Sequence, residues 1–189
     1  IVECTPLPLR ARAPLLRDGL DVFTPAVRRT PPESLDPNIK SHNYLNLVLA
    51  DLEVRDRSSH AWAVLLDTRG YLCEGIGSNI FLVKDRIVFT PNARYVLAGV
   101  SRQVVIELAL AEGFEVRETD LTAMDAAESD EAFITSTSFC ICPVRTYDGM
   151  TLGASKVPGP VTQQLTRAFA REAGHDFVAQ YLSSLGPDS

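Results

Sequence analysis

Three groups whose chemistry fits together lie in the middle of the chain. Lys40 follows the apolar Ile39 and supplies a primary amine that could form an imine with a carbonyl compound. Glu74 ends a short apolar run and supplies a carboxylate that could keep a pyridine nitrogen protonated. Gly99 and Ser101 open a predicted helix, whose first N–H groups could bind phosphate with help from the serine hydroxyl. An amine, a ring-facing acid and a phosphate cradle are what pyridoxal phosphate requires.

Each group taken alone also has an ordinary structural explanation. A lysine at the start of a helix is usually exposed, and a glutamate at the end of a strand often faces solvent. A glycine followed by a serine before a helix is a common N-cap pattern. The chemical interpretation therefore depends on the three groups occurring together.

Composition limits the class of protein and of partner. The chain has 189 residues, of which 46% are hydrophobic and 22% charged, enough for one sizeable core. A net charge of −6 argues against a nucleic-acid partner or an anionic membrane, because both require a basic surface. Neither a membrane-spanning apolar run nor a secretory signal is visible, and four sparse cysteines indicate reduced thiols in a cytoplasmic protein. The three histidines form no metal-ligand pattern.

Apolar periodicity and turn residues predict an α/β chain with a mixed sheet that positions these groups. In the proline-rich first 39 residues, short strands are predicted over 1–9 and 19–27. A helix is expected from Ser41, and Ser101 is the expected N-cap of another. Further strands are predicted over 61–67, 71–74, 79–84, 86–90, 114–119, 131–135 and 140–147, and further helices over 102–112, 121–128 and 160–173.

The order of four motifs resembles a known enzyme family. They are Ile39-Lys40-Ser41-His42-Asn43-Tyr44-Leu45, Glu74-Gly75-Ile76-Gly77-Ser78-Asn79-Ile80-Phe81, Leu97-Ala98-Gly99-Val100-Ser101-Arg102 and Ser136-Thr137-Ser138, accompanied by Phe89-Thr90-Pro91 and Gly159-Pro160-Val161-Thr162. In this order the chain resembles the class IV, fold-type IV pyridoxal-phosphate enzymes, from about Pro31 to Phe169. That family includes branched-chain and D-amino-acid aminotransferases and aminodeoxychorismate lyase. The resemblance implies a mixed sheet partly curled into a barrel with flanking helices.

The resemblance also implies roles for individual residues. Lys40 would hold the cofactor and move the proton, and Glu74 would face the pyridine nitrogen. Tyr44 matches a cofactor-binding tyrosine, although it follows the lysine one residue sooner than in branched-chain enzymes. Other residues expected to bind the cofactor are Ser78, Asn79, Leu97, Gly99, Val100, Ser101, Ser136 and Thr137. Ser138 and Phe139 are expected near the substrate, and the apolar strand that follows hints at a hydrophobic side-chain pocket.

The main departure from the family lies at the front of the chain. Members carry an N-terminal α+β domain of roughly a hundred residues, and the resemblance leads us to expect that this sequence lacks it. We therefore expect residues 1–39 to be the end of that domain and a linker, and residues 40–189 to be the C-terminal cofactor-binding domain. The expected protein is a homodimeric aminotransferase that uses amino-acid and 2-keto-acid substrates. A lyase acting on aminodeoxychorismate and an inactive fragment that keeps the fold remain open alternatives.

Overall fold

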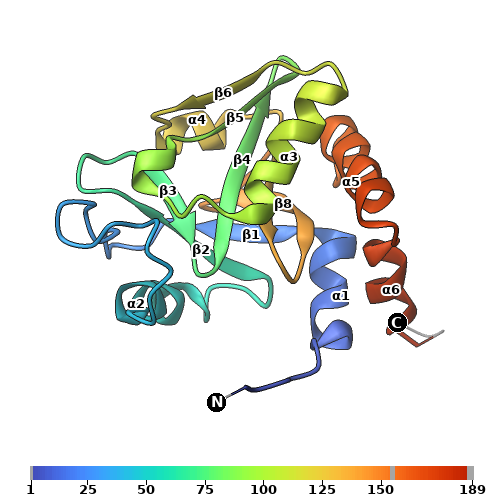
Figure 1. The fold of residues 1–189 in the computed structure, drawn as a ribbon, viewed down its shortest axis with the longest axis horizontal. Helices are drawn as coiled ribbons and strands as arrows, with labels where there is room; N and C mark the ends of the chain where they lie inside the picture. The colour runs from blue at the N-terminus through green and yellow to red at the C-terminus, as the bar shows by residue number, and fades with distance from the viewer. Residues whose placement is uncertain (1, 154–155, 187–189) are drawn as a thin grey trace.

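One mixed sheet forms the centre of the protein, and helices pack around it (Figure 1). The computed structural model describes residues 2–153 and 156–186. Its strands are β1 (Leu20–Phe23), β2 (Ala61–Leu66), β3 (Leu72–Gly75), β4 (Ser78–Lys84), β5 (Ile87–Pro91), β6 (Val116–Thr119), β7 (Glu131–Ser136), β8 (Cys140–Tyr147) and β9 (Met150–Thr151). Its helices are α1 (Leu9–Asp18), α2 (Leu45–Val54), α3 (Val100–Ala111), α4 (Ala123–Ala127), α5 (Pro160–Ala173) and α6 (Phe177–Ser183), with a 3-10 turn at Ala93–Tyr95.

Six of the strands close into a barrel. The sheet runs β3-β2-β1-β8-β7-β4-β5-β6, and an additional pairing between β3 and β4 joins the first strand to the sixth. β1 pairs in parallel with both of its neighbours, β2 and β8, whereas β3, β4, β7 and β8 pair antiparallel with one another. β5 and β6 extend the sheet outward from β4. The expected mixed sheet with a barrel and flanking helices is therefore confirmed.

Alternation along the barrel strands fills two separate cores. On β4, Ile80 and Leu82 join a cluster to which all six barrel strands contribute, which places these side chains in the barrel interior. The alternate residues Phe81 and Val83 face outward and pack with residues of α3 and α5. Strands buried on both faces explain why β4 reads as a nearly continuous apolar run.

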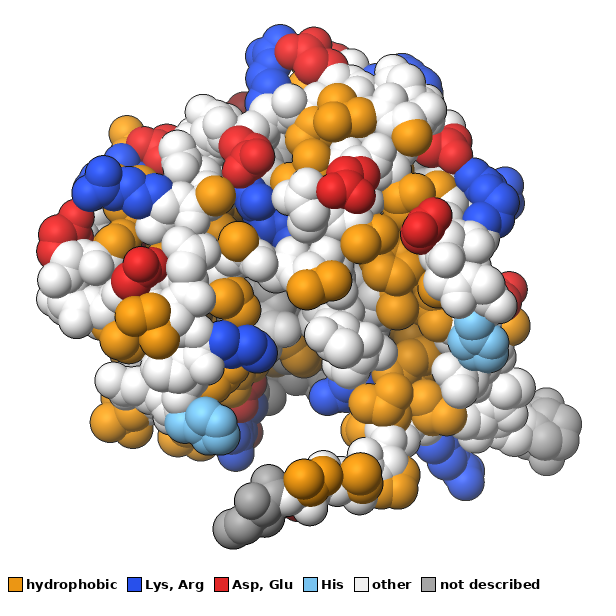
Figure 2. Space-filling model, in the orientation of Figure 1, with side chains coloured by type: hydrophobic (Ala, Val, Ile, Leu, Met, Phe, Trp, Pro, Cys, Tyr) orange, Lys and Arg blue, Asp and Glu red, His pale blue; other side chains and the backbone are white. Residues whose placement is uncertain are grey.

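The helices occupy different sides of the sheet. Figure 1 shows α5 and α6 together at one side and α2 at the opposite side. α2 buries Leu47, Ala50 and Val54 against the outer face of β2. Residues 2–8 run as an extended segment away from the body (Figures 1 and 2). None of the helices in the described part of the chain is both long and apolar enough to cross a membrane.

Two predicted helices start elsewhere than expected. The helix expected from Ser41 begins at Leu45, because residues 41–44 form a turn in which the N–H of Asn43 donates to the hydroxyl of Ser41 at 3.4 Å. The helix expected after Ser101 begins at Val100, with Gly99 in extended conformation as its N-cap. Lys40 therefore lies in a loop, and Ser101 lies inside the first turn of α3.

The first residues of the chain differ most from the expectation. No strand forms over residues 2–9; instead α1 occupies Leu9–Asp18 with Pro14 inside it. Proline disfavours a helix locally. However, Ala13 and Leu16 of α1 are buried in the hydrophobic cluster of the barrel interior, and α1 packs against α6. Tertiary packing of one apolar face outweighs the local cost of the proline. The strand expected over 19–27 is shorter and spans Leu20–Phe23.

Where the sequence carries explicit start and stop residues, the predicted bounds hold. α5 begins with Pro160 at its first position and ends before Gly174, whose φ of 63° is left-handed. β8 runs from Cys140 to Tyr147 and turns at Asp148-Gly149 into β9, as predicted.

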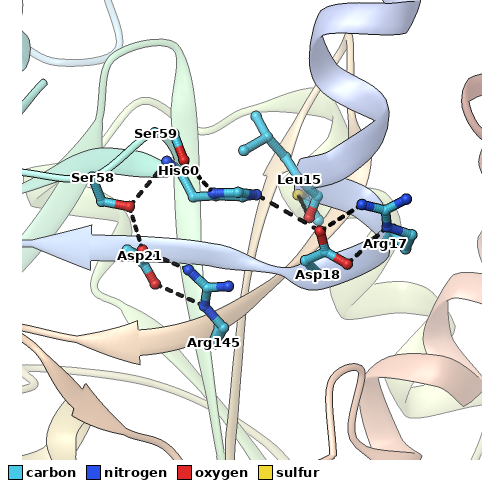
Figure 3. A network of polar contacts seen from close by, with 9 residues as sticks. Leu15, Arg17, Asp18, Asp21, Ser58, Ser59, His60 and Arg145 are labelled. Atoms are coloured by element: carbon cyan, nitrogen blue, oxygen red, sulfur yellow. Dashed lines mark hydrogen bonds and ion pairs between the residues drawn. The ribbon is translucent and has the colours of Figure 1, made fainter. Parts of the chain in front are cut away.

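A polar network surrounds the outward-facing carboxylate of β1 (Figure 3). Asp21 accepts hydrogen bonds from Arg145 Nε and Nη2 at 3.0 and 2.8 Å, from Thr146 Oγ1 at 2.8 Å and from Ser58 Oγ at 2.5 Å. Burial alone would raise the pKa of Asp21, but the bonds from Arg145, Ser58 and Thr146 lower it to about 2. Beside it, His60 Nδ1 lies 2.9 Å from the hydroxyl of Ser59. The network joins β1 to β8 and to the start of β2.

Candidate active site

A cavity opens where β3, β4 and β7 meet the first turn of α3 and the loop before α2. The predicted site residues that line it are Lys40, Tyr44, Glu74, Ser78, Asn79, Leu97, Gly99, Val100, Ser101, Ser136 and Thr137. Residues from four separate parts of the sequence are thus brought to one place. Ser138 and Phe139 are not among the lining residues.

A row of three side chains crosses the strands beneath this cavity. Glu74 on β3 is paired with Asn79 on β4, and Asn79 is paired with Thr135 on β7. Directly opposed residues of antiparallel strands point to the same face of a sheet, and all three line the cavity. Their exposed fractions are 5%, 6% and 1%, so the row is buried at the base of the site.

Glu74 is held at this base by two groups. Its Oε1 accepts a hydrogen bond from Arg29 Nε at 2.8 Å, and its Oε2 accepts one from the N–H of Leu97 at 3.0 Å. Arg29 is itself buried, in the extended connector after β1. Burial raises the pKa of Glu74, while the charge of Arg29 and the N–H of Leu97 oppose that rise. The pair keeps a carboxylate oriented at the edge of a cavity.

Asn79 holds the same segment from the other side. Its Nδ2 donates to the carbonyl of Leu97 at 2.9 Å, so Glu74 and Asn79 bind the two polar groups of one backbone residue. A Cβ placed on Gly99 would lie 2.5 Å from Asn79 Oδ1. Since Gly99 has an ordinary φ of −66°, close approach rather than conformation requires glycine here.

The first turn of α3 presents donors to the cavity. Val100 and Ser101 occupy its first two positions, and the first backbone bond of this helix runs from Gln103 N to the carbonyl of Gly99. The preceding N–H groups have no partner within the helix, which is the arrangement that binds phosphate at helix N-termini. The turn lies next to the row because Asn79 contacts Gly99.

Lys40 lines the cavity from the loop before α2. The side chain is exposed, and Nζ lies 3.5 Å from the hydroxyl of Tyr44. Both residues come from the loop before α2, which Leu47 anchors to the cluster beneath it. The amine is accessible to a molecule that enters the cavity.

The hydroxyl loop after β7 divides into two parts. Ser136 and Thr137 line the cavity, whereas Ser138 Oγ accepts a hydrogen bond from Arg12 at 2.7 Å. Phe139 is fully buried and packs edge-on against Trp62 with ring centroids 5.6 Å apart. The two residues expected near the substrate, Ser138 and Phe139, therefore contact Arg12 and Trp62 and do not line the cavity.

Sequence reasoning missed Arg29 and Thr135. Arg29 stands in a proline-rich connector without periodicity, and nothing local links it to a glutamate 45 positions away. Thr135 did carry a signal, because it begins the polar run that continues through Ser136 to Ser138. The strand pattern assigned that residue to the sheet, where it indeed lies.

The donor set fits a planar, phosphorylated cofactor. The cavity is lined by a buried carboxylate, by the N-terminus of a helix and by an exposed amine. The hydroxyl of Thr135 is buried at the cavity and makes no hydrogen bond within the described residues. Such an unpaired buried hydroxyl is expected where a ligand completes the bonding. No group of three His, Cys, Asp or Glu side chains suited to a metal occurs in the described ranges.

Comparison with known proteins agrees with this arrangement. The family model for amino-transferase class IV matches residues 2–147. A putative branched-chain-amino-acid aminotransferase of Methanocaldococcus jannaschii is 42% identical over 170 residues, covering 89% of this chain and 57% of that protein. The branched-chain-amino-acid aminotransferase of Escherichia coli K12 is 36% identical over 159 residues, covering 83% of this chain and 51% of that protein.

Solved structures give the same result for the fold. The crystal structure of the E. coli branched-chain amino acid aminotransferase matches with a TM-score of 0.76 and 36% identity, covering 80% of this chain and 50% of that one. The PLP form of the enzyme from Thermobaculum terrenum matches with a TM-score of 0.76 and 30% identity, covering 90% and 55%. The chain spans about half the length of these relatives. On the family match and the cavity together, this chain belongs to the class IV aminotransferases.

Proposed function

We propose that the chain is the pyridoxal-phosphate-binding part of an aminotransferase, which moves an amino group from an amino acid to a 2-keto acid. The observation that carries the proposal is the convergence of Lys40, Glu74 and the first turn of α3 on one cavity. When bound, the cofactor supplies an electron sink that stabilises negative charge at the carbon bearing the amino group. The solved relative described in its PLP form supports this choice of cofactor.

Each residue of the cavity would have a role that follows from its position. Lys40 Nζ would hold the cofactor and, once released by the incoming amine, carry a proton to and from the substrate carbon. Tyr44, with its hydroxyl 3.5 Å from that nitrogen, would orient the amine. Glu74 would keep the ring nitrogen protonated, and Arg29 would hold Glu74 in place. Gly99, Val100 and Ser101 would bind the phosphate.

We propose branched-chain or D-amino acids as the amino donor class, with a 2-keto acid as acceptor. The names of the relatives, which are branched-chain-amino-acid aminotransferases, favour the branched-chain class. We further propose that residues 40–189 form the cofactor-binding domain. α1 and β1, which precede these residues, would belong to the same domain, because β1 pairs with both β2 and β8. Free thiols at all four cysteines support the proposal of a cytoplasmic location.

We also propose that the protein forms a homodimer. Its support is the outer face of α2, where Leu45, Val48, Leu49 and Leu52 are between 38% and 67% exposed beside the cavity. Apolar side chains at this helical spacing are typical of a face that another protein covers. Light scattering should give twice the chain mass, and Leu49→Asp should reduce it; a wild-type monomer at high concentration would contradict the dimer.

The function is tested by adding pyridoxal phosphate to the purified chain and recording its absorbance, with Lys40→Ala and Lys84→Ala in parallel. Lys84 is the matched control, because it is exposed on β4 and is not among the residues that line the cavity; its Nζ donates to the carbonyl of Glu128 and lies 3.6 Å from Asp130. Wild type and Lys84→Ala should show a protein-bound cofactor band that borohydride fixes on Lys40, and Lys40→Ala should not. Amino acids should then convert the bound cofactor to its amino form.

A band that survives in Lys40→Ala would contradict the role of Lys40. A wild-type chain that shows no band would contradict the proposed function for this chain by itself. A band without any conversion by amino acids would favour the lyase or the inactive fragment.

A further inference from the structure

The hydroxyl of Thr135 is the buried polar group of the cavity that the rest of the site does not explain. Thr135 is the penultimate residue of β7, lines the cavity and is 1% exposed. Its Oγ1 makes no hydrogen bond to any of the residues that the structure describes. Buried hydroxyl groups in proteins nearly always have a partner, so this one points to a bonding partner that enters the cavity.

The other two side chains of the row already have hydrogen-bond partners within the chain. Glu74 accepts from Arg29 and from the backbone of Leu97, and Asn79 donates to the carbonyl of Leu97. Asn79, which the sequence placed among the cofactor contacts, thus holds the backbone before α3. Thr135 differs because its hydroxyl can still both donate and accept.

The position of Thr135 selects which part of a ligand it would reach. Glu74 lies two strands away, or roughly 10 Å at the usual strand spacing of about 4.8 Å. Asn79 lies between them and contacts Gly99, the N-cap of α3. α3 also packs on β7, and Thr137, which directly follows β7, lines the cavity. Thr135 therefore belongs to the helix end of the cavity.

We propose that Thr135 Oγ1 donates a hydrogen bond to the phosphate group that binds at the first turn of α3. The inference rests on the proposed function, because it assumes a phosphorylated ligand in this cavity. A phosphate oxygen is a strong, charged acceptor, and the first-turn N–H groups leave some of its oxygens free for side-chain donors. The proposal assigns a contact to Thr135 and a positioning role to Asn79.

The test is Thr135→Val, which removes the hydroxyl and keeps the shape of the side chain. Thr162→Val is the matched control, since its buried hydroxyl also lacks a partner in the described ranges but lies on α5, outside the cavity lining. Removing an unpaired buried hydroxyl should leave the thermal midpoint of the ligand-free chain unchanged or raise it, in both variants. Only Thr135→Val should weaken binding of pyridoxal phosphate and of inorganic phosphate, by about tenfold or more.

Two further arms make the assignment specific. Thr135→Ser keeps the hydroxyl and should bind both phosphate probes within a few fold of wild type. Pyridoxal without its phosphate should bind wild type and Thr135→Val equally. Equal loss of pyridoxal affinity would overturn the phosphate contact, and so would unchanged phosphate affinity in Thr135→Val.

The thermal midpoint separates a binding role from a structural one. A Thr135→Val chain that loses stability without ligand would show that the hydroxyl serves the fold, which contradicts the proposal. A wild-type chain that binds neither phosphate probe would contradict the proposed function and this inference together. Binding by wild type with no change in the variant contradicts the inference alone.

Discussion

Two carboxylates of the barrel wall each meet an arginine, but their surroundings differ. Asp21 on β1 accepts bonds from both a two-nitrogen face of Arg145 and the hydroxyls of Ser58 and Thr146. Glu74 on β3 accepts one bond from Arg29 and one from a backbone N–H, and it borders a cavity. The pKa of Asp21 falls to about 2, whereas burial raises the pKa of Glu74.

We propose that this difference separates a structural carboxylate from one that binds a ligand. The bonding capacity of Asp21 is used within the chain, so its charge holds strands together. Glu74 keeps lone pairs free toward the cavity, and its ionised form is less strongly stabilised. A ring nitrogen that brings a positive charge to the cavity would complete the bonding of Glu74. The same residue pair, a carboxylate and an arginine, would thus serve two purposes according to how many donors surround the carboxylate.

The largest expected effect is the loss of stability when one of the two arginines, Arg29 or Arg145, is replaced. Arg29→Met should destabilise the chain by about 3 kcal/mol, because it leaves the charge of Glu74 buried without its partner. Arg145→Met should cost less, because the side chain is 38% exposed and Asp21 keeps its two hydroxyl donors. Urea unfolding of both variants measures the free energies of unfolding. An equal or larger loss in Arg145→Met would remove the distinction between the pairs.

The second largest expected effect is a loss of stability at acidic pH, when Asp21 becomes protonated. A carboxyl whose pKa is lower in the folded chain adds stability above its unfolded value, and that stability is lost as the pH falls through the folded value. For Asp21 the window runs from 3.8 down to about 2. The loss should be at most about 2 kcal/mol, reduced by salt because Arg145 is partly exposed.

Urea midpoints at pH 5 and pH 2.5 should therefore differ less in Asp21→Asn than in wild type. Other carboxyl groups titrate in both chains, so the difference between the chains isolates Asp21. An identical pH dependence in the two chains would contradict the low pKa.

The smallest effect concerns the second anchor of Leu97. Gly99→Ala should weaken binding of pyridoxal phosphate, because its Cβ would lie 2.5 Å from Asn79 Oδ1. Asn79→Ala removes that atom and should make the alanine at position 99 tolerable in the double variant. The cycle should give a coupling free energy of about 1 kcal/mol, measured from the four dissociation constants. Additive effects would show that Asn79 does not position the turn.

The sequence predicted those parts of the molecule that local chemistry specifies. Pro160 and Gly174 mark both ends of α5, and the continuous apolar run from Ile80 to Val83 is typical of a strand buried on both faces, as β4 is. Residue type and order also selected Lys40, Glu74 and the first turn of α3, which line one cavity in the structure. These features depend on neighbours in sequence, where periodicity and capping act.

What the sequence did not predict depends on contacts between distant residues. α1 forms despite Pro14 because α6, at the far end of the chain, packs against it. Arg29 belongs to the site because the connector after β1 passes close to Glu74, a contact between residues that are far apart in the sequence. In the sequence, Asn79 and Thr135 are both simply polar residues of strands. Only the structure shows that Asn79 donates a hydrogen bond to the carbonyl of Leu97, whereas the hydroxyl of Thr135 has no partner among the described residues.

The bonds around Asp21 also bear on how the barrel forms. Asp21 and Arg145 are separated by 124 positions, and β1 closes the barrel between β2 and β8. A loop that long adds little to the equilibrium cost, since each doubling of length adds only about 0.6 kcal/mol. It slows folding considerably more, because distant pairings must be found before they are rewarded. The four-residue strand β1 therefore joins two strands that lie far apart in the sequence, so we expect its pairing with β8 to be a slow step in closing the barrel.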